Sequence, residues 1–265
     1  MISVIMPTYN EAGNIEELVE RTEKTLQKET LAGQARNPTK ASAFGRAGKK
    51  QETNNNENFE IIVVDDNSPD GTSNLVKKLQ KGRPYLRLVT RTTERGLPTA
   101  VERGIKESKG EVVAWFDCDL SVAPEQLAGM IPYLEEADIV LGSRFVDGGG
   151  DVRGVGYSKD FSKFLNDLAR MILSPVITDY TSGLIMAKKK ALEGTIFDGV
   201  HGTYFMGMIY RAYKKGWKIK EVPYVFGKRG YGESKIVGFK KYVKTGLGYL
   251  KALIVARIRY SKISK

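Results

Sequence analysis

Short apolar runs, separated by segments with helical spacing, dominate the first half of the chain. The expected strands are residues 2–6, 59–64, Leu86–Thr90, Val112–Phe116 and 139–142. Between them, apolar residues recur three or four positions apart, as in Ile15, Leu18 and Leu26 after the predicted helix cap Asn14. An alternation of strand and helix at this spacing predicts parallel strands with helices on both faces. We therefore expect an α/β domain with a largely parallel central sheet. We also expect helices over 124–134, which opens with proline, and over Thr203–Lys214, and a strand over 219–226.

Residues 28–58 interrupt the alternation. They are rich in Ala, Gly, Lys, Asn, Thr and Gln and contain almost no large apolar side chains. Such a segment has little to bury, so we expect a flexible insertion, either a solvated loop or a lid over a site. The expected organisation is a catalytic domain at 1–236, which contains this insertion, followed by a C-terminal helix at 237–265.

The positive charge lies at the C-terminal end. The net charge is +11, and residues 228–265 hold eleven basic residues and one acidic residue. From residue 237 onward, apolar residues form one helical stripe: Phe239, Tyr242, Val243, Gly246, Tyr249, Leu250, Leu253 and Ile254. A basic amphipathic helix suits an anionic surface, either lipid headgroups or nucleic acid, or packs its stripe on the domain itself.

The remaining composition indicates a reducing compartment. Cys118 is the single cysteine, so no disulfide within the chain is expected. The first strand begins at residue 2, which leaves no room for a signal peptide in this sequence. Lys251 and Arg257 interrupt the best candidate for a membrane span. We expect a cytoplasmic protein without a spanning helix.

Two carboxylates follow the fourth strand. Asp117 and Asp119 flank Cys118 directly after Val112–Phe116. Open α/β sheets bind ligands at the carboxyl ends of their strands. Mg²⁺ and Mn²⁺ prefer one or two carboxylates together with substrate phosphates. An isolated acidic pair is more often a solvated loop, but this position favours a divalent cation bound to a diphosphate.

Three polar loops follow strands of the predicted sheet, at residues 7–11, 64–72 and 117–121. In this order and spacing they resemble the GT-A fold of the family 2 glycosyltransferases. The later segments 142–145, 181–183 and 229–235 look like those of dolichyl-phosphate mannosyltransferases. The resemblance implies a Rossmann-like three-layer sandwich. It also implies metal-dependent, inverting transfer of mannose from GDP-mannose to dolichyl (polyprenyl) phosphate.

The resemblance also assigns roles to residues. It implies that the donor is bound by Pro7, Tyr9, Glu11, Val64, Asp66, Asp117, Cys118, Asp119, Arg229 and Lys235. Of these, Asp119, Arg229 and Lys235 would be catalytic. Arg229 and Lys235 would neutralise the departing diphosphate, since Arg is a forked donor and Lys a point charge, and Asp119 would act by holding the metal. The metal ligands would be Asp117, Asp119 and Ser121, with Mg²⁺ or Mn²⁺ as the cofactor. Because Ser121 stands where many prokaryotic members have Gln, the metal geometry stays open.

A lipid phosphate is already an anion at neutral pH, so the acceptor needs cations rather than a strong base. The resemblance implies Arg144 and Ser162 for this role. The resemblance predicts a basic residue at position 158, but this chain has Ser158 there. We predict that the next residue, Lys159, takes the place of that basic residue. Gly207 is a second departure, because relatives have an acidic residue there. His201 reads as a surface residue, and nothing predicts a histidine triad or a zinc site.

Two other functions stay open at this point. One is the same fold using UDP-glucose, because donor choice depends on a few contacts. The other is a non-catalytic adaptor at a membrane surface that retains a transferase fold. For the transferase we expect GDP-mannose, a polyprenyl phosphate and the cytoplasmic face of a membrane as partners, with a separate membrane-anchoring subunit also possible. We expect no nucleic acid.

Overall fold

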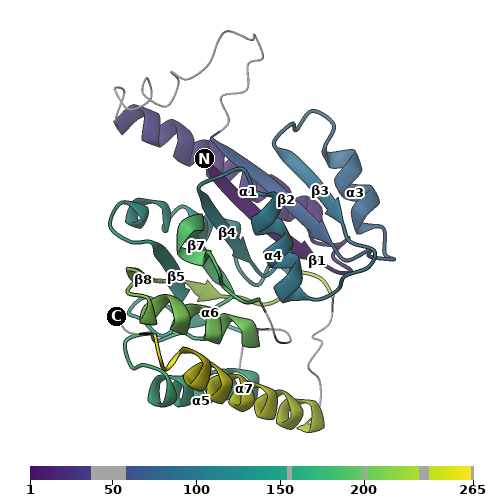
Figure 1. Ribbon diagram of the computed structural model, residues 1–265. Helices are drawn as coiled ribbons and strands as arrows, with labels where there is room; N and C mark the ends of the chain where they lie inside the picture. Colours follow the sequence, from purple (N-terminus) through teal and green to yellow (C-terminus); the bar gives the residue numbers. More distant parts are fainter. Residues whose placement is uncertain (37–57, 154–156, 198, 200–201, 233–238, 264–265) are drawn as a thin grey trace.

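A seven-stranded sheet runs through the middle of the protein (Figure 1). The computed structural model describes residues 1–36, 58–153, 157–197, 199, 202–232 and 239–263. In sheet order the strands are β3 (Leu86–Thr90), β2 (Phe59–Asp65), β1 (Ile2–Thr8), β4 (Val112–Phe116), β7 (Leu184–Lys188), β5 (Ile139–Ser143) and β8 (Ile219–Pro223). A second, two-stranded sheet pairs β6 (Gly150–Asp151) with β9 (Val225–Phe226). The strand order increases from β1 to β3 on one side and switches to β4 on the other.

The largely parallel sheet is confirmed. Strands β1 to β4 pair in parallel, and so do β5 and β8. Strand β7 is antiparallel to both of its neighbours, β4 and β5. Every residue of β2, with the sequence FEIIVVD, is buried. A nearly continuous apolar strand is typical of a central parallel strand that is covered on both faces.

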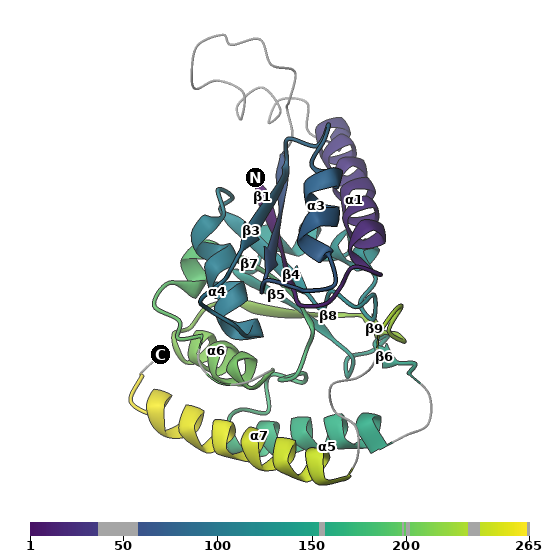
Figure 2. The ribbon, with the colours of Figure 1, turned by 90° about the vertical axis from the view of Figure 1, so that its right-hand side faces the viewer.

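Helices cover both faces of the sheet, so the domain has three layers (Figure 2). Because side chains alternate along a strand, Val4 and Met6 face one layer and Ile5 the other. The first layer contains α1 (Ile15–Arg36), α3 (Thr72–Leu79) and the 3-10 helices at Pro124–Leu127 and Ile131–Glu135. The second contains α4 (Leu97–Glu107), α5 (Tyr157–Ile172), α6 (Thr203–Lys214) and α7 (Phe239–Tyr260), and a third 3-10 helix lies at Lys189–Leu192.

Three sequence-based boundaries are corrected. One helix was expected over 124–134, but two 3-10 helices form there, because Pro132 in the second has no N–H to continue a helix. The expected strand 219–226 divides at Pro223, and Val225–Phe226 joins the small sheet. Helix α1 extends to Arg36 and so includes the beginning of the predicted insertion at 28–58. Residues 37–57 of that insertion lie outside the described residues.

Helix α7 packs along α6 and α5 (Figure 2). Its Leu253 is 0% exposed, and Ala256 and Tyr260 are also buried in the core beneath the sheet. Arg257 donates a 2.8 Å hydrogen bond to the hydroxyl of Tyr210 on α6. Part of the predicted stripe therefore packs on the domain. Among the helices that the structure describes, none is long and apolar enough to cross a membrane.

Candidate active site

The loops after β1, β2 and β4 turn sharply at one edge of the sheet. In the described parts of the chain, non-glycine residues with positive φ are Asn10 (62°), Asn67 (55°) and Leu120 (64°). Each lies in a different one of these three loops. Left-handed backbone is disfavoured for side chains with a Cβ atom, and such positions cluster at functional sites. The edge of the sheet where the three loops meet is therefore the candidate ligand-binding site.

Hydrogen bonds tie the first two loops together. The Asp66 N–H donates to the Thr8 carbonyl at 3.0 Å, and the Asn10 N–H donates to the Ser68 hydroxyl at 2.9 Å. Asp65 is fully buried and accepts from Thr8, Ser68 and Ser73. Asp65 is therefore a structural residue of these loops. This network fixes the start of the site before any ligand binds.

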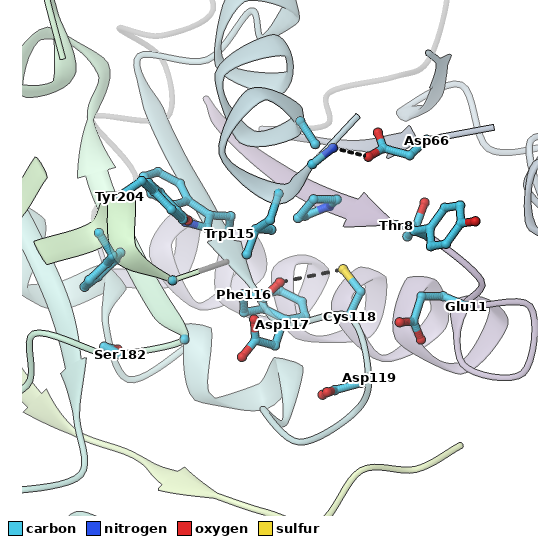
Figure 3. A pocket seen from close by; sticks show the side chains of 18 of the residues that line it. Thr8, Glu11, Asp66, Trp115, Phe116, Asp117, Cys118, Asp119, Ser182 and Tyr204 are labelled. Atoms are coloured by element: carbon cyan, nitrogen blue, oxygen red, sulfur yellow. Dashed lines mark hydrogen bonds between the residues drawn. The ribbon is translucent and has the colours of Figure 1, made fainter. Parts of the chain in front are cut away.

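A cleft of about 550 Å³ opens at this edge (Figure 3). It is lined by strand ends and the loops after them, by the first turn of α4, by the segment before β7, and by helices α6 and α7. It is lined by Pro7, Thr8, Tyr9, Glu11, Asp66, Arg95, Gly96, Leu97, Ala100, Trp115, Phe116, Asp117, Cys118, Asp119, Thr181, Ser182, Gly183, Gly202, Tyr204, Phe205, Phe226, Arg229 and Tyr249. The size suits a nucleotide sugar better than a single small ion.

Carboxylates dominate the floor of the cleft, where Figure 3 shows Glu11, Asp117 and Asp119. Burial and, next, the nearby Asp119 raise the pKa of Asp117 to about 7, against the opposite effect of Arg229 and Arg144. Desolvation and a neighbouring negative charge both disfavour the ionised form of the Asp117 carboxyl group. A divalent cation beside the two carboxylates would offset the repulsion between Asp117 and Asp119 and so favour the ionised form of Asp117.

Asp119 is held from two sides. Its Oδ1 accepts from the Ser121 N–H at 3.0 Å and from the Ser121 hydroxyl. Its Oδ2 pairs with Arg229 at 2.7 Å. The Gly230 N–H donates to the Asp119 carbonyl at 2.8 Å, which joins the loop after β9 to the loop after β4. Arg229 is thus placed beside the carboxylates by backbone contacts.

These residues fit a divalent cation. Each carboxylate oxygen has two lone pairs, so Asp119 retains acceptor capacity beyond its bonds to Ser121 and Arg229. Among the described residues no group of three or more His, Cys, Asp and Glu side chains could enclose a metal ion. Two carboxylates and an open side agree with an ion that is completed by substrate phosphates.

Gly183 lies against the Asp117 carboxylate. A Cβ atom at this position would stand 2.6 Å from Asp117 Oδ2. We expect Gly183→Ala to push the carboxylate aside and to weaken Mn²⁺-dependent donor binding at least tenfold, measured by calorimetry. Gly150→Ala is the control, since a Cβ atom at Gly150 meets nothing within 4 Å. Unchanged binding by the Gly183 variant would show that Asp117 does not need its present position.

The sequence profile described as glycosyl transferase family 2 matches residues 43–195, which is more than half of the chain. The chain belongs to glycosyl transferase family 2. Three proteins with similar sequences are named dolichol-phosphate mannosyltransferase. That of Pyrococcus furiosus is 34% identical over 94% of this chain, which spans only 62% of that relative's length. Those of Mycosarcoma maydis and Saccharomyces cerevisiae are 30% and 31% identical, covering 98% and 96% of this chain and 81% and 86% of theirs.

Solved structures confirm the fold of this family 2 member. Glucosyl-3-phosphoglycerate synthase from Mycobacterium tuberculosis, in complex with Mn²⁺, UDP and glucosyl-3-phosphoglycerate, aligns with a TM-score of 0.63. The alignment covers 97% of this chain and 79% of that chain, at 16% identity. The same enzyme with Mg²⁺ and UDP aligns with a TM-score of 0.61. At this identity the likeness establishes the GT-A architecture alone.

Most of the predicted donor residues line the cleft, and among those that the structure describes Val64 does not. Val64 is buried in β2, and only its carbonyl reaches the first loop, where it accepts from Thr8 at 3.4 Å. Lys235 lies outside the described residues, as does His201. Asp66 lines the cleft, but Arg91 and the Gly96 N–H already engage its two oxygens. Its direct contact with a donor stays a prediction.

The predicted acceptor residues are separated from the cleft. The Arg144 side chain is buried and donates to Asp179 from Nε and from a terminal nitrogen, each at 2.8 Å. Burial disfavours its charge, but Asp179 outweighs this and raises the pKa of Arg144. Arg144 also donates to the Thr181 hydroxyl at 2.6 Å, and Thr181 lines the cleft. Ser162 is half-buried and Lys159 exposed on α5. Their role toward an acceptor phosphate stays a prediction.

Because Cys118 lies between two carboxylates, the sequence predicts a raised pKa for its thiol and no nucleophilic role, and the structure agrees. Its thiol donates a 3.6 Å bond to the Phe116 carbonyl. Burial raises the pKa of Cys118 well above its ordinary value, and Glu11, Asp117 and Asp119 add to the effect. A thiol held in its neutral form is a poor nucleophile. Cys118 therefore lines the site without a covalent role.

Sequence reasoning missed three contributors to the cleft. Trp115 donates to the Tyr204 hydroxyl at 3.0 Å, which joins β4 to α6. Tyr249 of α7 lines the cleft beside Gly202, although the sequence suggests only a stripe for packing or membranes. Arg95 lies in the loop after β3 and also lines the cleft. Its position in a loop that follows a predicted strand could have indicated a role in ligand binding. Each was overlooked because no short motif surrounds it.

Proposed function

We propose that this chain catalyses inverting transfer of mannose from GDP-mannose to dolichyl or another polyprenyl phosphate. The observation that carries the proposal is the meeting of Asp117, Asp119 and Arg229 in one cleft of a family 2 chain. The relatives named dolichol-phosphate mannosyltransferase are 30–34% identical along nearly the whole chain.

The donor is proposed to lie across the ends of β1 and β4. The ring of Tyr9 offers a face for the base, and Glu11 and Asp117 lie further along the floor of the cleft. Arg229 neutralises Asp119 in this structure and lies where a diphosphate can accept its hydrogen bonds. Lys235 is proposed to add a second positive charge. Preorganised cations at a leaving group lower the barrier because they stabilise charge that develops during transfer.

Asp117, Asp119 and Ser121 are the residues proposed to hold the metal, Ser121 through its bonds to Asp119. Bound Mg²⁺ or Mn²⁺ would supply Lewis-acid stabilisation of the diphosphate.

The acceptor is proposed to approach from the side of Thr181 and α5. Its phosphate oxygen attacks the anomeric carbon from the face opposite GDP, and the bond to the diphosphate oxygen breaks. Arg144 supports this side through Thr181, and Asn166 of α5 donates to the same hydroxyl at 2.7 Å. Ser162 and Lys159 are the proposed contacts with the acceptor phosphate. The anionic nucleophile needs no base.

The α5/α7 face is proposed to rest on the cytoplasmic side of a membrane. We define this face by the exposed apolar residues Phe164, Met171, Leu247, Ile254, Val255 and Ile258. Figure 2 shows α5 and α7 side by side at one end of the molecule. Lys163, Arg170, Lys251, Arg257 and Arg259 are exposed on the same two helices. Apolar side chains among basic ones suit an anionic lipid surface. A separate anchoring subunit is an alternative cover for this face.

Removing apolar side chains from this face should weaken membrane binding. We expect the variant Phe164→Ser, Ile254→Ser and Ile258→Ser to bind anionic vesicles at least tenfold more weakly in sedimentation assays, since these side chains are already exposed and the fold does not need them. Leu31→Ser is the control, because Leu31 is also an exposed apolar residue and belongs to α1, which lies away from α5 and α7. Vesicle binding by the triple variant at the wild-type level would reject this face as the contact.

Calorimetry with GDP, UDP and GDP-mannose, with and without Mn²⁺, tests the donor. We expect tight binding of GDP and GDP-mannose that depends on Mn²⁺, and weaker binding of UDP. Preference for UDP would favour the UDP-glucose alternative, and failure to bind any of the three nucleotides would favour the adaptor.

A further inference from the structure

Asp66 holds the loop that follows β3 (Figure 3). Its Oδ1 accepts from Arg91 Nε at 2.7 Å, and its Oδ2 accepts from the Gly96 N–H at 2.7 Å. Arg91 donates in turn to the Gly96 carbonyl at 3.0 Å. Gly96 has a φ of 112°, a conformation that a residue with a side chain rarely adopts. Both ends of the loop, at Arg91 and Gly96, are therefore fixed to one carboxylate.

Arg95 projects from this loop into the cleft. Its guanidinium carbon lies 5.8 Å from the centre of the Tyr9 ring, and both residues line the cleft. No carboxylate of the described residues forms an ion pair with Arg95, whereas Arg229 is paired with Asp119. Arg95 is exposed, so its side chain can change direction without losing an ion pair. A fixed loop thus presents an available forked donor beside an aromatic face.

Guanine matches this arrangement. A base stacked on Tyr9 would take the place above the ring and move the guanidinium to the edge of the base. The N7 and O6 atoms of guanine form an acceptor pair that Arg contacts through two hydrogen bonds. Uracil has no such pair at the same edge. We propose that Arg95 recognises the N7/O6 edge of a guanine stacked on Tyr9, and so selects a guanosine diphosphate donor over a uridine one.

This inference rests on the proposed function, because it takes the cleft as the donor site. Asp66 positions the loop that carries Arg95, and its Oδ2, which accepts from the Gly96 N–H, keeps a lone pair for a direct contact with the donor.

The test compares nucleotides rather than sugars. Binding of GDP, 7-deaza-GDP, IDP and UDP in Mn²⁺ is measured by calorimetry for wild type, Arg95→Ala and Arg95→Lys. Arg103→Ala on α4 is the control, since Arg103 pairs with Glu107 and does not line the cleft. 7-Deaza-GDP lacks N7 only, and IDP retains both N7 and O6.

We expect Arg95→Ala to bind GDP and IDP about ten- to one-hundred-fold more weakly, with UDP changed less than about twofold. Wild type should bind 7-deaza-GDP more weakly than GDP, and Arg95→Ala should not distinguish them. Arg95→Lys should keep the charge but lose most of the preference for N7. If Arg95→Ala loses equal affinity for GDP and UDP, the inference is overturned in favour of a contact with the diphosphate. Unchanged GDP binding by Arg95→Ala would also overturn it. So would tighter binding of UDP than of GDP by wild type.

A transfer assay separates this inference from the proposed function. Wild type that transfers mannose from GDP-mannose supports the function whatever the Arg95 variants do. Wild type that binds GDP through Arg95 but transfers no mannose would overturn the function and leave the base contact intact.

Discussion

Asp119→Asn should abolish nearly all transfer from GDP-mannose. We expect kcat/KM in Mn²⁺ to fall at least about 10³-fold, equivalent to roughly 4 kcal/mol of transition-state stabilisation. The asparagine keeps the shape but removes the charge that faces the proposed metal and pairs with Arg229 at 2.7 Å. The pair is partly exposed, so the melting temperature should change by only a few degrees.

Asp138→Asn is the matched control for this change. Asp138 pairs with Lys188 at 3.0 Å, immediately before the amino end of β5, and it does not line the cleft. Transfer by this variant should stay within about twofold of wild type. Equal kcat/KM for wild type and Asp119→Asn would contradict a role for this carboxylate in binding the metal or the diphosphate.

Deleting residues 237–265 should unfold the domain. Considered from sequence alone, the tail is separable, and donor binding should survive its removal because the predicted donor residues end at Lys235. The structure changes that expectation, since Leu253, Ala256 and Tyr260 are buried in the core and Tyr249 lines the cleft. Exposing this core should cost a large part of the 5–15 kcal/mol that stabilises a typical domain. Thermal unfolding and circular dichroism would detect the loss.

A single substitution tests the same packing in a protein that still folds. Leu253→Ala should lower the free energy of unfolding by about 2–5 kcal/mol, as is usual for a fully buried leucine. Leu247→Ala on the same helix is the control, because its side chain is 63% exposed, and it should change stability by less than about 0.5 kcal/mol. Similar stabilities for the two variants would show that α7 does not belong to the core.

Strand positions could be predicted because the parallel strands are short, mainly apolar runs between polar segments. Val112–Phe116 and Leu86–Thr90 have the expected bounds, and so does helix Thr203–Lys214. The break at Pro132 could have been anticipated from the missing N–H of proline. The antiparallel position of β7 could not, because the apolar pattern of a strand contains no information about its direction.

The candidate site was predictable where residues follow strands directly. Asp117 and Asp119 come straight after β4, so their place at the sheet edge follows from the strand itself. Arg144 also follows its strand, but the sequence could not show that Asp179, from a distant segment, already pairs with it. Tyr249 and Arg95 line the cleft because of how α7 and the loop after β3 pack on the rest of the domain. The spacing of residues along the sequence does not show this packing.

The stereochemistry of the lipid product tests the central claim most directly. The full chain is incubated with Mn²⁺, GDP-mannose and a short, soluble polyprenyl phosphate, and the product is analysed by mass spectrometry and NMR. We predict a polyprenyl phosphate mannose whose anomeric configuration is opposite to that of the donor, and no glucosyl product from UDP-glucose. A product with retained configuration, a glucosyl lipid from UDP-glucose, or no mannosyl lipid at all would contradict the account.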